Sequence, residues 1–172
     1  AEVAQRVNQF IEKNPGKEWI TGRGWQYTSF ENGLPDSKAL SAITNEVAVF
    51  VKAYDGHSGW ANKKALQLAG VDGNTKYAGF GEIVKDKAGK IVGVLSERAQ
   101  GLVGSAYGAF LDTQSESFHK EKWATGIRMA EEDCLKKGIT SFQDAGSSFN
   151  DVKWMKELAD AGKLNIRHWL MV

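Results

Sequence analysis

The run Val47-Ala48-Val49-Phe50-Val51 is the feature of this sequence that most constrains its fold. The run is too short to span a membrane and is rich in β-branched residues, so it predicts a strand that is covered on both faces. Such strands belong to sheets with helices on both sides, where functional groups follow the carboxyl ends of the strands. We therefore expect an α/β fold with its chemistry directly after this strand.

A polar segment follows the predicted strand. Residues 55–62 read Asp-Gly-His-Ser-Gly-Trp-Ala-Asn and combine a carboxylate, an imidazole, a hydroxyl, an indole and an amide. We predict that this segment is a loop and that His57 lines a site. A structural interpretation stays open for its neighbours, because Asp55 can shape a turn, Trp60 can fill the core and Asn62 can cap the next helix.

The remaining pattern predicts alternating helices and strands. Apolar residues at helical spacing predict an amino-terminal helix that ends at Asn14-Pro15-Gly16. Two alternating segments, 81–85 and 90–95, flank a turn and predict a β-hairpin. The order helix, strand, helix, strand at the carboxyl end predicts parallel βαβ units. Further helices are expected at 37–43, 63–69, from 96, 115–137 and to 161, and further strands at 18–22, 139–142 and 165–172.

Composition restricts the classes of protein and partner. Lys and Arg (22) almost balance Asp and Glu (21), so neither nucleic acid nor an anionic membrane is an expected partner. No apolar stretch is long enough to span a bilayer. The single cysteine, Cys134, excludes an internal disulfide and a cysteine-built zinc site, and we expect a buried, unreactive thiol. These features predict one domain over residues 1–172 and a cytoplasmic location.

Two other segments carry candidate site residues. Glu97 follows the predicted hairpin, and Gln143 and Asp144 follow the predicted strand 139–142. The alternative for Glu97 is an acidic residue that complements a helix dipole, and the alternative for Asp144 is a turn residue that bonds its own backbone. His168 alternates with apolar residues, which favours a packed histidine over a ligand. The sequence contains no self-contained catalytic motif.

Four blocks of the sequence resemble, in order, those of a known family. They are Trp19-Ile20-Thr21-Gly22-Arg23-Gly24-Trp25, residues 55–62 with 65–70, Gly93-Val94-Leu95-Ser96-Glu97-Arg98-Ala99, and Gly138-Ile139-Thr140-Ser141-Phe142-Gln143-Asp144-Ala145-Gly146. The chain is thereby identified as a member of the YtcJ-like amidohydrolases of amidohydrolase family 3. These proteins are metal-dependent hydrolases on a TIM-barrel scaffold.

The resemblance implies an internal fragment of a larger enzyme, because the family's metal-binding His-x-His pair and its later metal ligands have no match here. A closed barrel typically needs about 250 residues, so we expect a partial TIM-barrel-like set of βα units with a mostly parallel sheet and an inserted β-hairpin. The parent enzyme would use a divalent metal, most simply zinc, and no metal ligand is assigned in this chain. The resemblance implies substrate-side positions for His57, Trp60, Asn62, Glu97, Gln143 and Asp144. Among the candidates we predict catalytic roles for Glu97 and His57, and substrate binding by Asp55, Trp60, Asn62, Gln143 and Asp144.

The expected function is therefore hydrolysis of C–N bonds in small amides or related compounds by the parent, with the isolated chain inactive. A second hypothesis is a non-catalytic binding or interaction module that uses the chain's aromatic residues. A third is a metal-free acid–base hydrolase that uses His57 with Glu97 or Asp144. Unpaired sheet edges in a partial barrel also predict self-association into a homo-oligomer.

Overall fold

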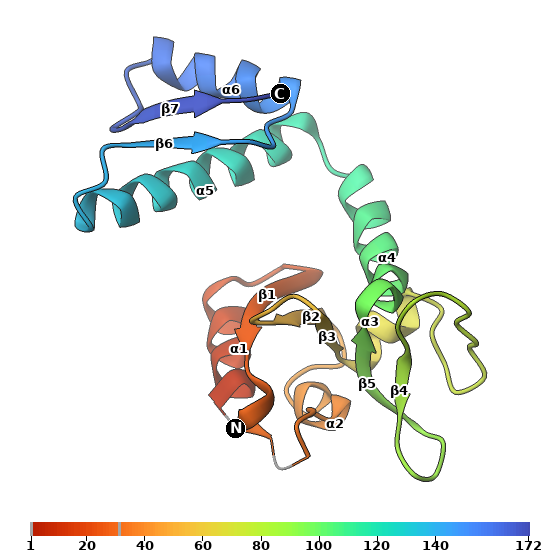
Figure 1. Ribbon diagram of the computed structural model, residues 1–172. Helices are drawn as coiled ribbons and strands as arrows, with labels where there is room; N and C mark the ends of the chain where they lie inside the picture. Colours follow the sequence, from red (N-terminus) through yellow and green to blue (C-terminus); the bar gives the residue numbers. More distant parts are fainter. Residues whose placement is uncertain (1, 31) are drawn as a thin grey trace. The chain divides into compact units, whose positions relative to one another are not determined.

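A computed structural model of the protein describes residues 2–30 and 32–172 (Figure 1). The chain divides into two compact units, one ending at Asp112 and the other running from Thr113 to Val172. The expectation of one domain over residues 1–172 stays a prediction.

The first unit is built on a five-stranded sheet with the order β1-β2-β3-β5-β4. Strand β1 (Trp19–Trp25) is parallel to β2 (Ala48–Ala53), whereas β3 (Ser58–Ala61), β5 (Ile91–Ser96) and β4 (Ile83–Lys85) join by antiparallel pairings. The prediction of a mostly parallel sheet is therefore wrong for this unit. The reason is the short connections before β3 and between β4 and β5, since only antiparallel strands can be joined by tight turns.

Helices cover both faces of β2. They are α1 (Glu2–Lys13), α2 (Ser37–Ser41), α3 (Lys63–Leu68) and α4 (Gly101–Asp112), with 3-10 turns η1 (Tyr27–Ser29) and η2 (Glu97–Gln100). Phe50 belongs to a buried cluster with residues of α3 and α4, and Val49 belongs to a second cluster with residues of α1 and α2. The predicted doubly covered strand and the predicted hairpin are thus confirmed.

The segment predicted as a loop contains a strand. Only residues 54–57 form a turn, and β3 follows with all four of its residues buried. Its composition of serine, glycine, tryptophan and alanine gives no apolar alternation, so the strand is determined by its pairing with β2 and β5. The prediction of a helix cap at Asn62 is confirmed, because its side chain accepts a hydrogen bond from the backbone N–H of Ala65.

The second unit contains α5 (Glu116–Lys136), β6 (Ser141–Asp144), α6 (Phe149–Asp160) and β7 (Arg167–Leu170). Strands β6 and β7 are parallel and α6 connects them, which confirms the predicted βαβ unit (Figure 1). Strand β6 begins two residues later than predicted, so Gln143 and Asp144 lie within it. Cys134 on α5 is a free, partly buried thiol.

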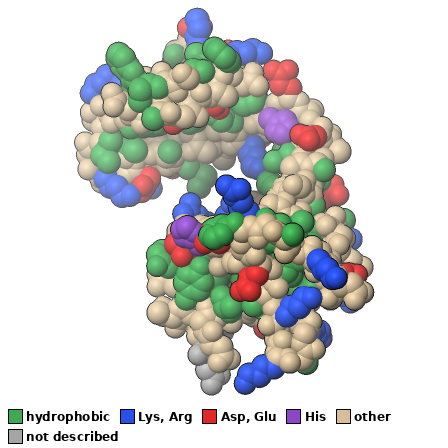
Figure 2. Space-filling model, turned by 45° about the vertical axis from the view of Figure 1, so that its right-hand side comes forward, with side chains coloured by type: hydrophobic (Ala, Val, Ile, Leu, Met, Phe, Trp, Pro, Cys, Tyr) green, Lys and Arg blue, Asp and Glu red, His purple; other side chains and the backbone are tan. Residues whose placement is uncertain are grey.

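The visible surface mixes charge types. On the face shown in Figure 2, basic and acidic side chains are interspersed with hydrophobic ones. Among the described residues, no helix combines the length and the apolar character that a membrane crossing requires.

Candidate functional site

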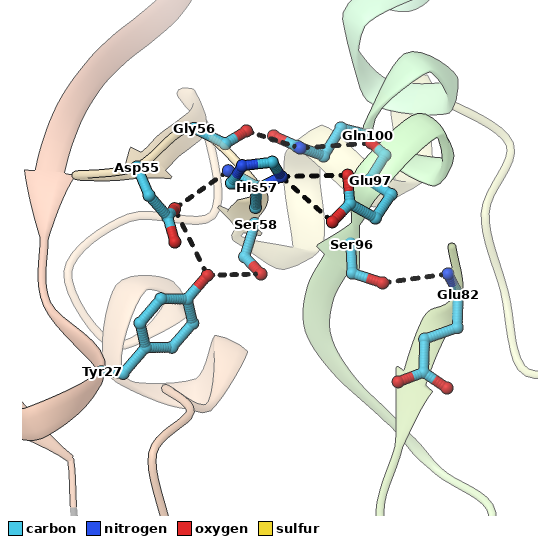
Figure 3. A network of polar contacts seen from close by, with 9 residues as sticks. All are labelled: Tyr27, Asp55, Gly56, His57, Ser58, Glu82, Ser96, Glu97 and Gln100. Carbon is cyan, nitrogen blue, oxygen red and sulfur yellow. Dashed lines mark hydrogen bonds and ion pairs between the residues drawn. The ribbon is translucent and has the colours of Figure 1, made fainter. Parts of the chain in front are cut away.

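Strand register brings His57 and Glu97 together in the first unit. Ser58 of β3 is paired with Ser96 of β5 in the antiparallel ladder. The residue before Ser58 is therefore opposite the residue after Ser96, and the Glu97 N–H donates a hydrogen bond of 2.8 Å to the His57 carbonyl. The turn after β2 and the end of β5 thus supply one catalytic candidate each (Figure 3).

The two side chains also contact each other directly. Nδ1 of His57 lies 3.0 Å from Oε1 and 3.1 Å from Oε2 of Glu97. Because a carboxylate only accepts, Nδ1 carries the proton and Nε2 is the nitrogen that can exchange a proton with a substrate. The His57 side chain is 65% exposed and that of Glu97 is 33% exposed, so solutes can reach this dyad.

The dyad changes the acidity of the imidazole. The hydrogen bond to Glu97 is the main cause that raises the pKa of His57 above its ordinary value of 6.5, and the negative charges of Glu97 and Asp55 raise it further. The protonated imidazole therefore persists closer to neutral pH, where a general acid or base is most effective.

Glu97 adopts a backbone conformation that is unusual for its residue type. Its φ of 47° is the one positive value among the described non-glycine residues. Such a conformation costs about 1–3 kcal/mol and persists only where the surroundings impose it. Here the N–H of Arg98 donates to the Phe80 carbonyl, and a Cβ on Gly81 would come within 2.8 Å of the Glu97 Cβ. Strain of this kind is typical of functional sites.

Asp55 shapes the turn that carries His57. Its Oδ1 accepts a 2.9 Å hydrogen bond from the His57 N–H and a longer one, 3.4 Å, from the Tyr27 hydroxyl. The same hydroxyl is 3.0 Å from the Oγ of Ser58 (Figure 3). Burial raises the pKa of Tyr27, and the Asp55 charge adds to that increase although the Ser58 hydrogen bond lowers it. Tyr27 was not predicted from the sequence, whereas Ser58 supplied the hydroxyl of the predicted polar segment.

Arg23 supports the same turn from β1. Its Nε and Nη2 donate hydrogen bonds of 3.2 and 3.0 Å to the Tyr54 carbonyl. The turn is therefore held both by Arg23 at its first residue and by Asp55 within it.

Trp60 and Asn62 lie inside the protein. Trp60 is 1% exposed, and its Nε1 has no hydrogen-bond partner in the described part of the chain. Asn62 is fully buried, and its Oδ1 accepts from the N–H groups of Val49 and Ala65 at 3.0 Å. Its Nδ2 donates to the carbonyls of Thr44 and Val47. These contacts favour the structural interpretation, and substrate roles for the two residues stay predictions.

Gln143 and Asp144 belong to the second unit. Both are exposed on β6. Asp144 accepts hydrogen bonds of 3.1 Å from the Gly146 N–H and the Ser147 hydroxyl, which is the turn-forming behaviour given above as its alternative. Their placement on the substrate side stays a prediction.

A buried pair in the second unit was not predicted. Glu131 of α5 is 1% exposed, and its carboxylate lies 2.7 Å from Nε2 of His168 on β7. Asn165 donates to the same carboxylate through its backbone and its side chain. His168 is thus a packed residue, as its alternation with apolar neighbours indicated. A charged residue four positions after Ile127, on the apolar face of the predicted helix, was the signal for this pair.

The described residues do not form a metal site by themselves. Over residues 2–30 and 32–172, no three His, Cys, Asp or Glu side chains gather closely enough to hold an ion. The His57–Glu97 pair offers two ligands at most. This donor set fits proton transfer, which needs only the two groups.

Comparison with known proteins covers nearly the whole chain. It is 31% identical over 99% of its length to the putative amidohydrolase YtcJ of Bacillus subtilis, and 25% identical over 95% to an N-substituted formamide deformylase of Arthrobacter pascens. The chain spans 32% and 30% of these relatives, about a third of their length.

Two solved structures are similar to this chain in fold. An uncharacterised metal-dependent hydrolase from Pyrococcus horikoshii matches 98% of the chain with a TM-score of 0.60 and 22% identity, and the match covers 31% of that protein. A similar hydrolase from Pyrococcus furiosus matches with a TM-score of 0.57 and 19% identity. Residues 1–171 match the amidohydrolase family. The chain therefore belongs to the amidohydrolase family.

Proposed function

We propose that this chain is part of a metal-dependent hydrolase that acts on C–N bonds of small amides or related compounds. The observation that carries the proposal is the His57–Glu97 dyad, which combines an exposed imidazole with a strained glutamate. The similarity to a relative named N-substituted formamide deformylase supports a C–N bond as the target.

The dyad has a defined chemical task in this proposal. Nε2 of His57 takes a proton from the attacking nucleophile or returns one to the leaving nitrogen, and Glu97 holds the imidazole in the tautomer with Nδ1 protonated. The negative charge of Glu97 also stabilises the imidazolium that forms. Substrate would approach from the turn, where Asp55 lies two positions before His57 in the sequence. We also propose substrate-side positions for Gln143 and Asp144 in the complete protein.

The metal is assigned to the complete protein. We propose a divalent ion, most simply zinc, with ligands that lie mainly outside this chain, because the described residues supply no three-ligand cluster. The same finding supports the proposal that the isolated chain is inactive. Hydrolysis of an N-substituted formamide by the 172-residue chain with added zinc would contradict it.

Other properties follow from the partial barrel that we propose. Strands β1 and β4 are the outer strands of the five-stranded sheet, and exposed sheet edges favour pairing with another chain. We therefore propose that the isolated chain forms homo-oligomers, which size-exclusion chromatography with light scattering would measure. We also propose a cytoplasmic location and small-molecule substrates, without nucleic acid or membrane partners.

The experiment uses the full-length protein and a panel of N-substituted formamides and simple amides. We expect His57→Ala and Glu97→Gln each to lower kcat by about 10²- to 10⁴-fold, the contribution of a general acid or base. Glu82→Gln is the matched control, because Glu82 is an exposed carboxylate beside the same hairpin. Its hydrogen bonds to Ser96 are made by its backbone and leave its carboxylate out of the contact. Unchanged turnover in both dyad variants would exclude the proposed role.

A metal-free reaction is the second candidate, because the dyad is formed by protein groups alone. The two candidates differ in their response to chelators. Dialysis against a chelator abolishes turnover if the complete protein needs its metal, and leaves a His57-dependent turnover if it does not. Loss of activity that zinc restores supports the metal-dependent proposal.

A further inference from the structure

Gln100 lies behind the dyad in a position that the proposed reaction does not use. It ends the 3-10 turn η2 and is 9% exposed. Its Nε2 donates a hydrogen bond of 2.9 Å to the Gly56 carbonyl and one of 3.2 Å to the Glu97 carbonyl (Figure 3). One side chain therefore contacts the backbone of the turn before His57 and the backbone of its partner.

The chemistry of these partners settles which way the amide faces. Both are carbonyl oxygens, which only accept, so the NH₂ group must face them. A flipped amide would place its own oxygen against two oxygens. Oε1 is buried without a hydrogen-bond partner among the described residues, which is unfavourable. The Gln100 amide thus leaves its oxygen without a hydrogen bond, while its NH₂ group donates to the Gly56 and Glu97 carbonyls.

Gly59 of β3 leaves the space that the Gln100 side chain occupies. A Cβ on Gly59 would come within 3.1 Å of Oε1 of Gln100 and within 2.3 Å of the Phe50 ring. A larger residue at position 59 would push both side chains away, so the absence of a side chain there is part of the arrangement. The side chain of Gln100 therefore lies against β3 and has little freedom to adopt another rotamer.

We propose that Gln100 is a positioning residue that fixes His57 and Glu97 at hydrogen-bond distance. The proposal rests on the proposed function for its importance to the reaction, but its geometric content can be tested without it. Gln100 binds no substrate in this proposal. It holds Gly56 on one side and the strained Glu97 backbone on the other, so the two catalytic groups keep their separation.

The test is the titration of His57 in the 172-residue chain by proton–carbon NMR, which is simple because the chain has three histidines. Gln100→Met keeps the approximate length of the side chain and removes both donors. We expect the pKa of His57 in this variant to fall from its raised value toward about 6.5. Gln67→Met, an exposed glutamine of α3, is the matched control and leaves the titration unchanged. A folded Gln100→Met chain with the wild-type pKa of His57 would overturn the proposal.

A second measurement needs no variant. Hydrogen-bonded, buried Nε2 protons of Gln100 should exchange with solvent at least tenfold more slowly than those of the exposed Gln67. Equal exchange rates overturn the proposal even if Gln100→Met fails to fold. The two proposals are separable: if His57→Ala leaves turnover of the full-length protein unchanged while Gln100→Met still lowers the pKa of His57, the positioning role stands and the proposed function fails.

Discussion

Nδ1 of His57 lies 3.0 Å from the Glu97 carboxylate because Ser58, which follows His57, is paired with Ser96, which precedes Glu97, in the β3–β5 ladder. The two residues are 40 positions apart in the sequence, and neither belongs to a self-contained motif. The dyad is therefore a product of strand register. A slip of one residue in this ladder would separate the two side chains, because successive side chains of a strand point to opposite faces.

The first prediction concerns the pH dependence of turnover in the full-length protein. Glu97 raises the pKa of His57, so the basic form of the imidazole becomes dominant only above a pH higher than 6.5. We expect kcat to rise with pH through that raised pKa. In Glu97→Gln the charge is absent, so the rise should move to lower pH while the maximum falls. Stopped-time assays between pH 5 and about 9 would measure this, a range that brackets histidine titration.

Asp55, a second carboxylate near His57, provides a comparison for this prediction. Asp55 also raises the pKa of His57, and Tyr27 and Arg23 contact the same turn. Asp55→Asn should therefore move the rise in the same direction by a smaller amount than Glu97→Gln. A pH profile that is identical in wild type and Glu97→Gln would show that another group controls turnover.

The second prediction compares Gly and Ala at position 97. Glu97→Ala removes the carboxylate and keeps the positive φ, whereas Glu97→Gly removes the carboxylate and relieves the strain. Because a strained non-glycine residue costs about 1–3 kcal/mol and glycine adds about 0.5–1 kcal/mol of chain entropy, we expect Glu97→Gly to be about 1 kcal/mol more stable than Glu97→Ala. Urea unfolding of the chain measures the difference, and both variants should lose turnover equally. Equal stability of the two variants would mean that position 97 is not strained.

Sequence reasoning located the elements that local chemistry determines. The helix from Lys63 was predicted from the cap at Asn62, and the β4–β5 hairpin from two alternating segments around a turn. Strand β3 was missed because pairing with β2 and β5, not local composition, makes a Ser-Gly-Trp-Ala segment a strand, and β5 lies far along the chain. The mostly parallel sheet was expected for the same reason, since an unrecognised strand hides the reversal of chain direction.

The residues of the candidate site likewise differ in how far the sequence predicts them. His57 and Glu97 could be proposed because each follows a predicted strand, but their contact depends on a register that no single segment encodes. Gln100 and Tyr27 are ordinary polar residues in the sequence, and only the folded backbone gives them partners. Trp60 and Asn62 belong to the polar segment 55–62, yet their side chains are buried.

The third prediction concerns Asn62, whose side chain bonds four backbone groups. Asn62→Ala leaves buried N–H groups at Val49 and Ala65 without acceptors and removes a helix cap. We expect a loss of about 3 kcal/mol, since an unsatisfied buried group costs about 1–3 kcal/mol and a cap about 1 kcal/mol. Asn62→Asp keeps an oxygen that can accept from both N–H groups, so with a protonated carboxyl it should lose less than Asn62→Ala. Urea unfolding gives both values, and a loss below about 0.5 kcal/mol, ordinary for a surface substitution, would show that these hydrogen bonds carry no stability.

The fourth prediction concerns the buried Glu131–His168 pair of the second unit. Burial of the Glu131 carboxylate acts to raise its pKa, but hydrogen bonds from His168, Asn165 and the Ile166 N–H outweigh burial, so the pKa is lowered from 4.5. A carboxyl with a lowered pKa in the folded state contributes stability that is complete above the unfolded value and is lost as pH falls through the folded value. The second unit should therefore keep its stability down to about pH 4.5 and lose it progressively below that pH.

Hydrogen exchange with mass spectrometry isolates this effect, because peptides from residues 113–172 report on the second unit separately. Glu131→Ala leaves the buried donors of His168 and Asn165 without an acceptor, and an unsatisfied buried group costs about 1–3 kcal/mol, so we expect a loss of about 3 kcal/mol in those peptides at neutral pH. Glu132→Ala is the matched control, because Glu132 is the exposed neighbour on the same helix. Without the Glu131 carboxylate, the fall in protection below pH 4.5 should also disappear. Unchanged protection in Glu131→Ala would mean that apolar packing between α5 and β7 holds the unit, with the hydrogen bonds to Glu131 contributing nothing.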